Sequence, residues 1–210
     1  MPDDKPEGQR IGWQCRSSDY PFTGRAFRIR QDHVRLPSDV EIDLAYMESK
    51  GAVWVVPVTD DGQIVLIKQY RYAVDDWTWE VPAGGKHDHD GSDEELARRE
   101  LSEEVGATCQ SLQYIGWSYG AVSVATSRCH VFLARGVRLD GAPHRDPAEF
   151  IVVQPVSIAE AMGMARSGQI KDCKSALALL MCEPHLTPSA LDQSRRADHP
   201  RPDSLPTPSR

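Results

Sequence analysis

The chain has 210 residues, which is enough for one large domain or for one domain with appendages. Apolar residues make up 40% and charged residues 26%, as in ordinary soluble globular proteins. The net charge of −7 argues against a nucleic acid as the main partner. The sequence contains no run of 18 apolar residues, so we do not expect it to span a membrane.

The composition divides the chain into four segments. Residues 1–12 are polar and lack the apolar stretch of a secretory signal, so we expect a disordered tail on a cytoplasmic protein. Residues 13–48 predict a small N-terminal β region, and residues 49–182 predict the main domain. Residues 183–210 hold six of the 15 prolines and no aromatic residue, which predicts a second disordered tail.

Strand and helix patterns follow one another along the chain. In the N-terminal region, residues 24–30, 33–36 and 41–48 read as strands. In the main domain, strands are expected at 52–58, 63–70, 77–81, 112–117, 129–134 and 150–156, and helices at 92–105, 157–166 and 172–182. Thr59-Asp60-Asp61-Gly62 has the chemistry of a hairpin turn. The pattern predicts an α/β protein with helices on the faces of a sheet.

The helix expected at 92–105 carries three acidic residues on one face. Ser92 and Glu95 form a capping box, and Gly106 fits the C-terminal cap. Glu100, Glu103 and Glu104 lie at i, i+3 and i+4, where like charges repel by about 0.2–0.5 kcal/mol per pair.

A divalent cation would turn that repulsion into binding. Carboxylate oxygens, completed by water and substrate phosphate, are the ligands that Mg²⁺ prefers. The three glutamates therefore predict metal-assisted chemistry on a phosphate compound. The alternative is a solvated acidic face that pairs with Arg98 and Arg99.

Residues 85–107 resemble the Nudix box, which has the form G-x5-E-x7-R-E-U-x-E-E-x-G-U with U apolar. The matching positions are Gly85, Arg99, Glu100, Leu101, Glu103, Glu104, Gly106 and Ala107. Gly91 stands where the box has its first glutamate. The resemblance implies that this glutamate supports the helix arginine and the metal-binding loop, and Asp90 or Asp93 could take its place. The resemblance implies a Nudix-type α/β/α sandwich with a mixed sheet.

Residues outside the box are similar to the ADP-ribose pyrophosphatase branch of Nudix hydrolases. They are Pro57, Gly62, Leu66, Gln69, Tyr70, Arg71, Glu80 and Gly84, with the segments 149–151 and 168–172. The resemblance implies Mg²⁺-dependent hydrolysis of a nucleoside diphosphate linked to another moiety, with Mn²⁺ as an alternative metal. ADP-ribose is the best single substrate, giving AMP and ribose 5-phosphate. The resemblance also implies that the protein forms a homodimer through residues 13–48.

The resemblance also implies roles for individual residues. The Ala83 carbonyl, Glu100, Glu103 and Glu104 are the expected metal ligands. Arg71, Glu80 and Gly85 are the expected substrate contacts, with an exposed ion pair as the alternative for Arg71. Glu103 and Glu149 are the expected catalytic residues, with Glu149 as general base and Asp146 in reserve. Arg99, four residues from both Glu95 and Glu103, is expected to support the helix.

Other residues near this region could contribute. The aromatic candidates for stacking on a nucleobase are Tyr70, Tyr72, Trp77, Trp79, Phe22 and Phe27, although most aromatic residues are core residues. The run His87-Asp88-His89-Asp90 suits either a transition metal or a solvated turn.

Two departures from the branch keep other functions open. Ser118 to Ser123 lacks a proline common after the box, and Thr126-Ser127 replaces a loop glutamate, so another nucleotide sugar or a dinucleotide is an alternative substrate. Gly91 motivates a further alternative, a Nudix-fold module that senses a nucleotide without hydrolysing it.

Overall fold

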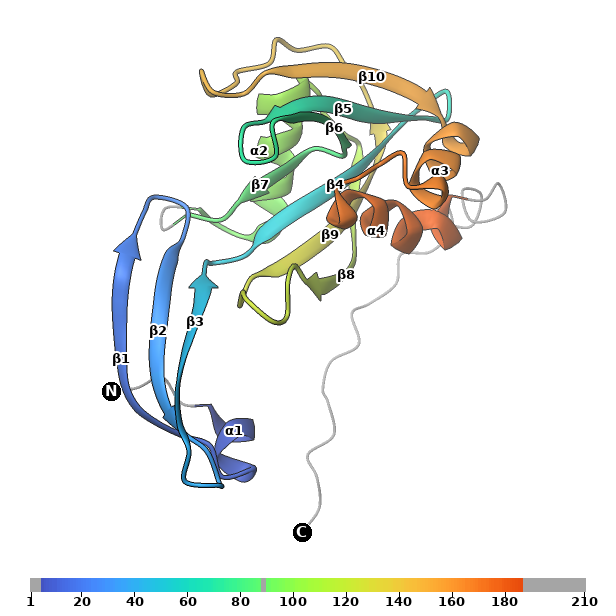
Figure 1. Ribbon diagram of the computed structural model, residues 1–210. Helices are drawn as coiled ribbons and strands as arrows, with labels where there is room; N and C mark the ends of the chain where they lie inside the picture. Colours follow the sequence, from blue (N-terminus) through green and yellow to red (C-terminus); the bar gives the residue numbers. More distant parts are fainter. Residues whose placement is uncertain (1–4, 88–89, 187–210) are drawn as a thin grey trace.

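The computed structural model describes residues 5–87 and 90–186 and contains two β-sheets (Figure 1). The N-terminal sheet has the strand order β1-β2-β3, with β1 at Gln14–Thr23, β2 at Arg28–Arg35 and β3 at Glu41–Glu48. The larger sheet is built from β4 (Ala52–Thr59), β5 (Gln63–Arg71), β6 (Asp76–Glu80), β7 (Ala83–Gly85), β8 (Ser111–Tyr119), β9 (Arg128–Val137) and β10 (Ile151–Ser157). The helices are α1 (Pro6–Arg10), α2 (Asp93–Val105), α3 (Ile158–Ser167) and α4 (Cys173–Cys182), followed by a 3₁₀ turn at Glu183–His185.

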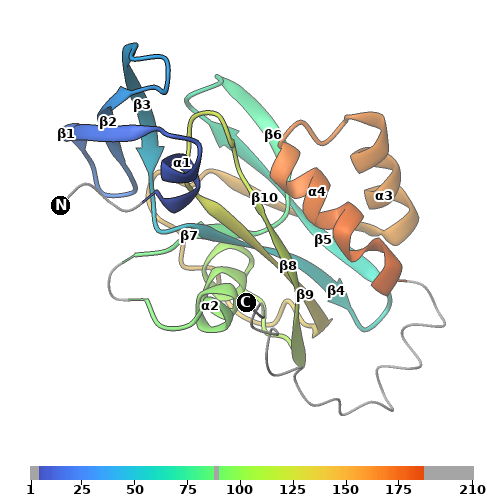
Figure 2. The same cartoon turned by 90° about the horizontal axis from the view of Figure 1, so that it is seen from below.

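The larger sheet is the middle layer of a sandwich. Figure 2 shows α2 on one of its faces and α3 and α4 on the other. Val53 and Val55 of β4 pack in the core beneath α2, whereas Val56 and Val58 pack in the core beneath α3 and α4. Coverage of both faces explains why β4 is apolar from Ala52 to Val58. Because β4 and β9 are parallel and the other pairs antiparallel, the predicted α/β/α sandwich with a mixed sheet is confirmed.

The hairpin between β4 and β5 opens beyond its turn and makes room for two short strands. The turn closes with a hydrogen bond from Gly62 N to Thr59 O of 3.0 Å, as predicted. Further along, β7 pairs with the start of β4 and β6 pairs with the end of β5. The glycine segment expected as a turn is therefore a strand at Ala83–Gly85, and it contacts α2.

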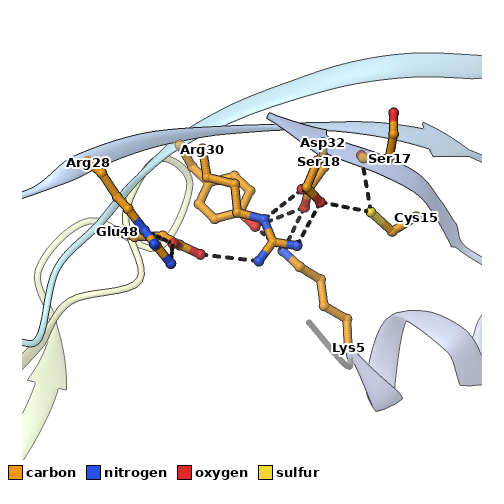
Figure 3. A network of polar contacts seen from close by, with 9 residues as sticks. Lys5, Cys15, Ser17, Ser18, Arg28, Arg30, Asp32 and Glu48 are labelled. Carbon is orange, nitrogen blue, oxygen red and sulfur yellow. Dashed lines mark hydrogen bonds and ion pairs between the residues drawn. The ribbon is translucent and has the colours of Figure 1, made fainter. Parts of the chain in front are cut away.

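A network of buried charges supports the N-terminal sheet (Figure 3). Arg30 and Asp32 are each only 1% exposed, and Arg30 Nε donates to Asp32 Oδ1 at 2.6 Å. Asp32 also accepts from Ser18 Oγ at 2.6 Å and from Tyr46 Oη at 2.8 Å. Burial raises the pKa of Asp32, but these hydrogen bonds outweigh it and lower the pKa to about 2. Arg30 also forms an ion pair with Glu48 at 3.4 Å.

The N-terminal sheet is clasped to the sandwich by the segment 121–127. Met47 N donates to Val124 O at 2.8 Å, and Thr126 N donates to Met47 O at 3.0 Å. The hydroxyls of Ser49 and Ser127 are hydrogen-bonded at 2.7 Å. These three contacts fix the end of β3 beside the loop that follows β8.

Several expectations for the ends of the chain are corrected. Within the predicted N-terminal tail, residues 6–10 form helix α1, because Pro6 presets the first turn and Arg10 pairs with Glu7 at 2.7 Å. At the other end, Leu186 is buried, so the folded body extends past residue 182. The rest of the predicted C-terminal tail lies outside the described residues.

The strands of the N-terminal sheet also differ from the expectation. Residues 14–23, which carry no clear strand pattern, form β1, and the two short strands expected downstream merge into β2. Strand β1 is largely exposed, so burial imposes little alternation on its sequence. No helix in the described part of the chain is long and apolar enough to cross a membrane.

Candidate active site

Helix α2 presents its acidic residues toward the glycine strand β7. The predicted capping box is present, since Ser92 Oγ accepts from Glu95 N at 3.2 Å and Glu95 Oε2 accepts from Ser92 N at 2.7 Å. Gly106 ends the helix in the left-handed conformation, with φ of +64°. Between these caps, Glu100 is 8% and Glu104 is 3% exposed, so two of the three carboxylates are buried rather than solvated.

The two buried carboxylates lie against the backbone of β7. Glu104 Oε2 accepts a hydrogen bond from Ala83 N at 3.0 Å. A Cβ on Gly84 would lie 2.0 Å from Cδ of Glu100, so only glycine leaves room for that carboxylate. The sequence Ala83-Gly84 thus forms a cradle for both side chains.

Burial makes these carboxylates hard to ionise without a cation. It raises the pKa of Glu100 to about 7 and that of Glu104 to about 8. The negative charges of Glu103 and Glu149 raise the pKa of Glu100 further. Those of Glu100 and Glu149 do the same for the pKa of Glu104. Arg99 partly opposes the rise for Glu100, and the Ala83 amide and Arg71 partly oppose it for Glu104. A bound cation would relieve the remaining repulsion.

Arg99 is held by the turn before the helix. Its Nη1 donates to Asp90, whose carboxylate is fully buried, and Asp90 Oδ2 also accepts from His87 N at 2.6 Å. Of the two aspartates considered as replacements for the first box glutamate, Asp90 is therefore the one that contacts Arg99. Asp93 instead pairs with Lys86 at 2.6 Å.

The expected ion pairs of Arg99 are present in part. Arg99 Nε lies 3.6 Å from Glu103 Oε2, as predicted, and Arg99 Nη2 donates to Glu100 Oε1 at 3.3 Å. The expected pair with Glu95 is not formed, because the Glu95 carboxylate is used in the capping box. Glu103 is the most exposed of the three helix carboxylates, with 45% of its side chain accessible.

A cleft of about 680 Å³ brings most of the predicted site residues together. Its walls include the predicted residues Arg71, Ala83, Gly84, Gly85, Arg99, Glu100, Glu103, Glu104, Asp146 and Glu149. Glu149 and Asp146 come from the loop before β10, where Glu149 Oε2 accepts from Asp146 N at 3.0 Å. His144 of the same loop and Arg25 of the β1–β2 turn also line the cleft, and neither was predicted.

The carboxylates of the cleft suit a hard cation. Among residues 5–87 and 90–186, no three His, Cys, Asp or Glu side chains already converge to enclose an ion. Mg²⁺ does not require such a cage, because it takes one or two carboxylates and completes its octahedral shell with water and substrate phosphate. The oxygen donors at Glu100, Glu104 and the Ala83 backbone fit that mode.

Arg71 and Glu80 form a bidentate pair at the edge of the cleft. Arg71 Nε donates to Glu80 Oε1 at 2.8 Å, and Nη2 donates to Glu80 Oε2 at 2.5 Å. Glu80 is buried, whereas 43% of the Arg71 side chain is exposed. This pair orients the guanidinium and leaves part of it available to an anion.

Arg71 also lines a second cavity of about 570 Å³ on the other side of β7. This cavity contains Trp54 and Lys174, whose ammonium lies 5.6 Å from the centre of the Trp54 ring. The sequence marked Trp54 only as a strand residue. It gave no signal that α4 would bring a lysine to the same place.

The aromatic candidates lie outside the cleft, with one near it. Tyr70 and Trp77 contact each other with ring centroids 6.0 Å apart, Tyr72 is exposed, and Trp79 packs on the core. Of the N-terminal pair Phe22 and Phe27, Phe27 lines a cavity that adjoins the cleft. Within the run 87–90, residues 88 and 89 lie outside the described residues.

Comparison with known proteins agrees with this geometry. The NUDIX domain model matches residues 48–173, so the chain belongs to the Nudix hydrolase family. The chain is 33% identical over 159 residues to an ADP-ribose pyrophosphatase of Bacillus subtilis, covering 75% of this chain and 85% of the relative.

A second relative and a solved structure are similar over comparable lengths. An ADP-ribose pyrophosphatase of Mycobacterium tuberculosis is 34% identical over 157 residues, covering 73% and 75% of the two chains. The crystal structure of an ADP compounds hydrolase superposes with a TM-score of 0.73 at 21% identity, covering 87% and 96% of the two chains, which supports the fold.

Proposed function

We propose that this Nudix hydrolase cleaves the pyrophosphate of ADP-ribose to give AMP and ribose 5-phosphate, with Mg²⁺ as its metal and Mn²⁺ as a substitute. The observation that carries the proposal is the placement of two buried carboxylates, Glu100 and Glu104, against Ala83-Gly84 beside the oriented guanidinium of Arg71. The two relatives named ADP-ribose pyrophosphatase support the choice of substrate.

In this proposal the metal is held by Glu100, Glu104 and the Ala83 carbonyl, with Glu103 as a further or water-mediated ligand. When bound, it neutralises pyrophosphate charge and lowers the pKa of a coordinated water. Arg71, supported by Glu80, binds a phosphate oxygen, and Gly85 lets the substrate approach the backbone. Arg99 keeps Glu103 in place.

Glu149 is the proposed general base, with Asp146 in reserve. It takes the proton of the attacking water as the new P–O bond forms, and the bridging P–O bond breaks to release the two monophosphates. Its position in the wall of the same cleft, close enough for its charge to act on Glu100 and Glu104, supports this role.

The test is AMP release from ADP-ribose by the purified protein, with and without Mg²⁺. We expect release only with metal, and we expect Glu104→Gln to lower kcat by more than the roughly 10- to 100-fold that changes around a metal site typically cost. Glu94→Gln is the matched control, because Glu94 is an exposed residue of the same helix that pairs with Arg98. Unchanged turnover in Glu104→Gln would contradict the metal assignment.

The alternatives make different predictions in the same assay. Another nucleotide sugar or a dinucleotide as substrate predicts faster turnover of that compound in a substrate panel. A sensor without activity predicts tight nucleotide binding and no turnover with Mg²⁺ or Mn²⁺. The pairing of Asp90 with Arg99 speaks against the sensor, because it replaces the contact that Gly91 cannot make.

Homodimer formation and a cytoplasmic location remain predictions. Exposed Tyr20, Phe22, Val40 and Leu44 on the N-terminal sheet support a dimer formed through this region. Light scattering coupled to size-exclusion chromatography would measure the mass in solution.

A further inference from the structure

A cavity of about 710 Å³ lies beside the active-site cleft, between the N-terminal sheet and the sandwich. The β1–β2 turn at residues 23–27 forms one wall, and the junction at residues 48–50 forms another. Lys86, His87 and Thr126 complete the described lining. We call this cavity the junction pocket. Its volume lies within the range of about 300–1,000 Å³ that is usual for small-molecule sites.

The junction pocket is basic in an acidic protein. Of the described lining residues, four are Lys or Arg and one is a carboxylate, whereas the whole chain has a net charge of −7. Arg28 and Glu48 offset each other, because they pair at 2.7 Å. The other cationic side chains of the lining are Arg25, Lys50 and Lys86, and Lys86 is likewise offset, by Asp93 at 2.6 Å.

The adjoining active-site cleft is acidic, because five carboxylates and three arginines line it. Arg25, Ala26 and His87 line both cavities, so the two spaces share a wall and one extended ligand can occupy both. A substrate whose pyrophosphate lies in the cleft therefore has room to extend one end into the junction pocket.

Arg25 is placed to act on that end. It is exposed on the β1–β2 turn, and within residues 5–87 and 90–186 it has no hydrogen bond or ion pair. A guanidinium can bind a phosphate with two parallel hydrogen bonds. Phe27 adds an apolar wall, with its ring 5.5 Å from that of Phe22.

We propose that the junction pocket is a phosphate subsite, and that the preferred substrate is an ADP-ribose derivative that carries a third phosphate on one of its two sugars. Arg25 binds that phosphate, and Lys50 and Lys86 lie in the same lining. This proposal rests on the proposed function for the chemistry in the cleft, and adds the class of substrate that the enzyme selects.

The kinetic test compares kcat/KM for ADP-ribose, ADP-ribose 2′-phosphate and ADP-ribose 1″-phosphate with Mg²⁺. The two phosphorylated compounds distinguish a phosphate on the adenosine side from one on the terminal ribose. We expect one of them to be preferred over ADP-ribose by about tenfold, the effect of one charge-assisted hydrogen bond. Arg25→Gln should remove most of that preference.

Arg16→Gln is the matched control, because Arg16 is an exposed arginine of β1 outside the pocket lining and its loss changes the net charge equally. It should keep the preference. Equal or lower kcat/KM for both phosphorylated compounds would overturn the proposal, and so would a preference that persists in Arg25→Gln.

A binding measurement separates this proposal from the proposed function. If the adenosine side enters the pocket, titration calorimetry without metal should give a Kd for adenosine 2′,5′-bisphosphate about tenfold lower than for AMP, and Arg25→Gln should abolish the difference. If the terminal ribose enters it, ribose 1,5-bisphosphate should bind more tightly than ribose 5-phosphate by a similar factor. Absence of both differences would contradict the subsite even if ADP-ribose is hydrolysed, and their presence would support it even if ADP-ribose is not.

Discussion

A Cβ atom on Gly91 would lie 2.0 Å from Oε2 of Glu95, the oxygen that accepts the hydrogen bond from Ser92 N. The capping box of α2 and a side chain at position 91 therefore compete for the same space. Asp90, one residue earlier, reaches Arg99 without entering that space.

Asp90→Ala should impair catalysis, and Gly91→Glu should partly rescue it. Removal of the Asp90 carboxylate leaves Arg99 without its anchor, and we expect kcat or Mg²⁺ affinity to fall by about 10- to 100-fold, as for other groups that support metal ligands. A glutamate at 91 in the Asp90→Ala background supplies a new partner for Arg99 but displaces Glu95, at a cost of about 1 kcal/mol in stability. Steady-state kinetics and thermal unfolding of the single and double variants check both effects. Full activity of Asp90→Ala would show that Arg99 needs no anchor.

Adjacent glycines of β7 should respond differently to alanine. Gly84→Ala would place its Cβ against the Glu100 carboxylate, so we expect metal affinity to drop by at least about tenfold as that ligand is displaced. Gly85→Ala meets no atom within 4 Å and should leave metal affinity unchanged. Calorimetric titration with Mn²⁺ measures both. Equal affinities in the two variants would mean that Glu100 is not a ligand.

Metal binding should strengthen steeply with pH. Burial raises the pKa of Glu100 to about 7 and of Glu104 to about 8, so in the metal-free protein each carboxyl holds, below that pH, a proton that a metal must displace. Because the folded-state pKa values lie above the unfolded value, the metal-free protein should lose stability as pH rises from about 4.5 through 8. Melting temperatures with and without Mg²⁺ should therefore diverge as pH rises through this range. A gap that does not depend on pH would contradict the assignment.

The buried pair in the N-terminal sheet should be costly to break. Asp32→Asn removes the shorter of two ion pairs of the buried Arg30 and leaves the one to Glu48 at 3.4 Å, and breaking a buried pair typically costs about 3–5 kcal/mol. The loss should be local, so hydrogen exchange should accelerate in β1–β3 more than in β4 and β9. Replacement of both residues, as Arg30→Met with Asp32→Leu, should be less damaging than Asp32→Asn alone.

The contribution of Asp32 to stability should depend on pH with the opposite sign to that of the active-site carboxylates. The folded-state pKa of Asp32, about 2, lies below the unfolded value of 3.8, so this stabilisation is present above about pH 4 and lost as pH falls toward 2.

The sequence predicts the sandwich because periodicity and caps reflect burial directly. Val53 to Val58 are apolar since both faces of β4 are covered, and Ser92 and Gly106 mark the ends of α2 through local hydrogen bonds. The helix carboxylates of the cleft could be predicted for the same reason, because Glu100, Glu103 and Glu104 share one helix face.

Other parts depend on contacts between distant segments. Strand β1 is stabilised by pairing with β2 and by polar contacts such as that of Ser18 with Asp32, which leave no periodic pattern. Arg25, His144 and Lys174 come to the site region from three separate elements, so their spacing along the chain carries no signal. Asp90 could be proposed from the sequence, but its choice over Asp93 depends on the fold of the preceding turn.

The clasp between β3 and the segment 121–127 constrains how ligands exchange. To swing the N-terminal sheet away from the sandwich, the protein would have to exchange the two Met47 backbone hydrogen bonds and the Ser49–Ser127 hydrogen bond for water. At about 0.5–1.5 kcal/mol each, such a swing would be rarely populated. Ligands are then expected to enter and leave by local movement of the turn that carries Arg25 and the loop that carries Glu149, while the angle between the two sheets stays constant. An interdomain fluorescence distance should stay unchanged through the catalytic cycle.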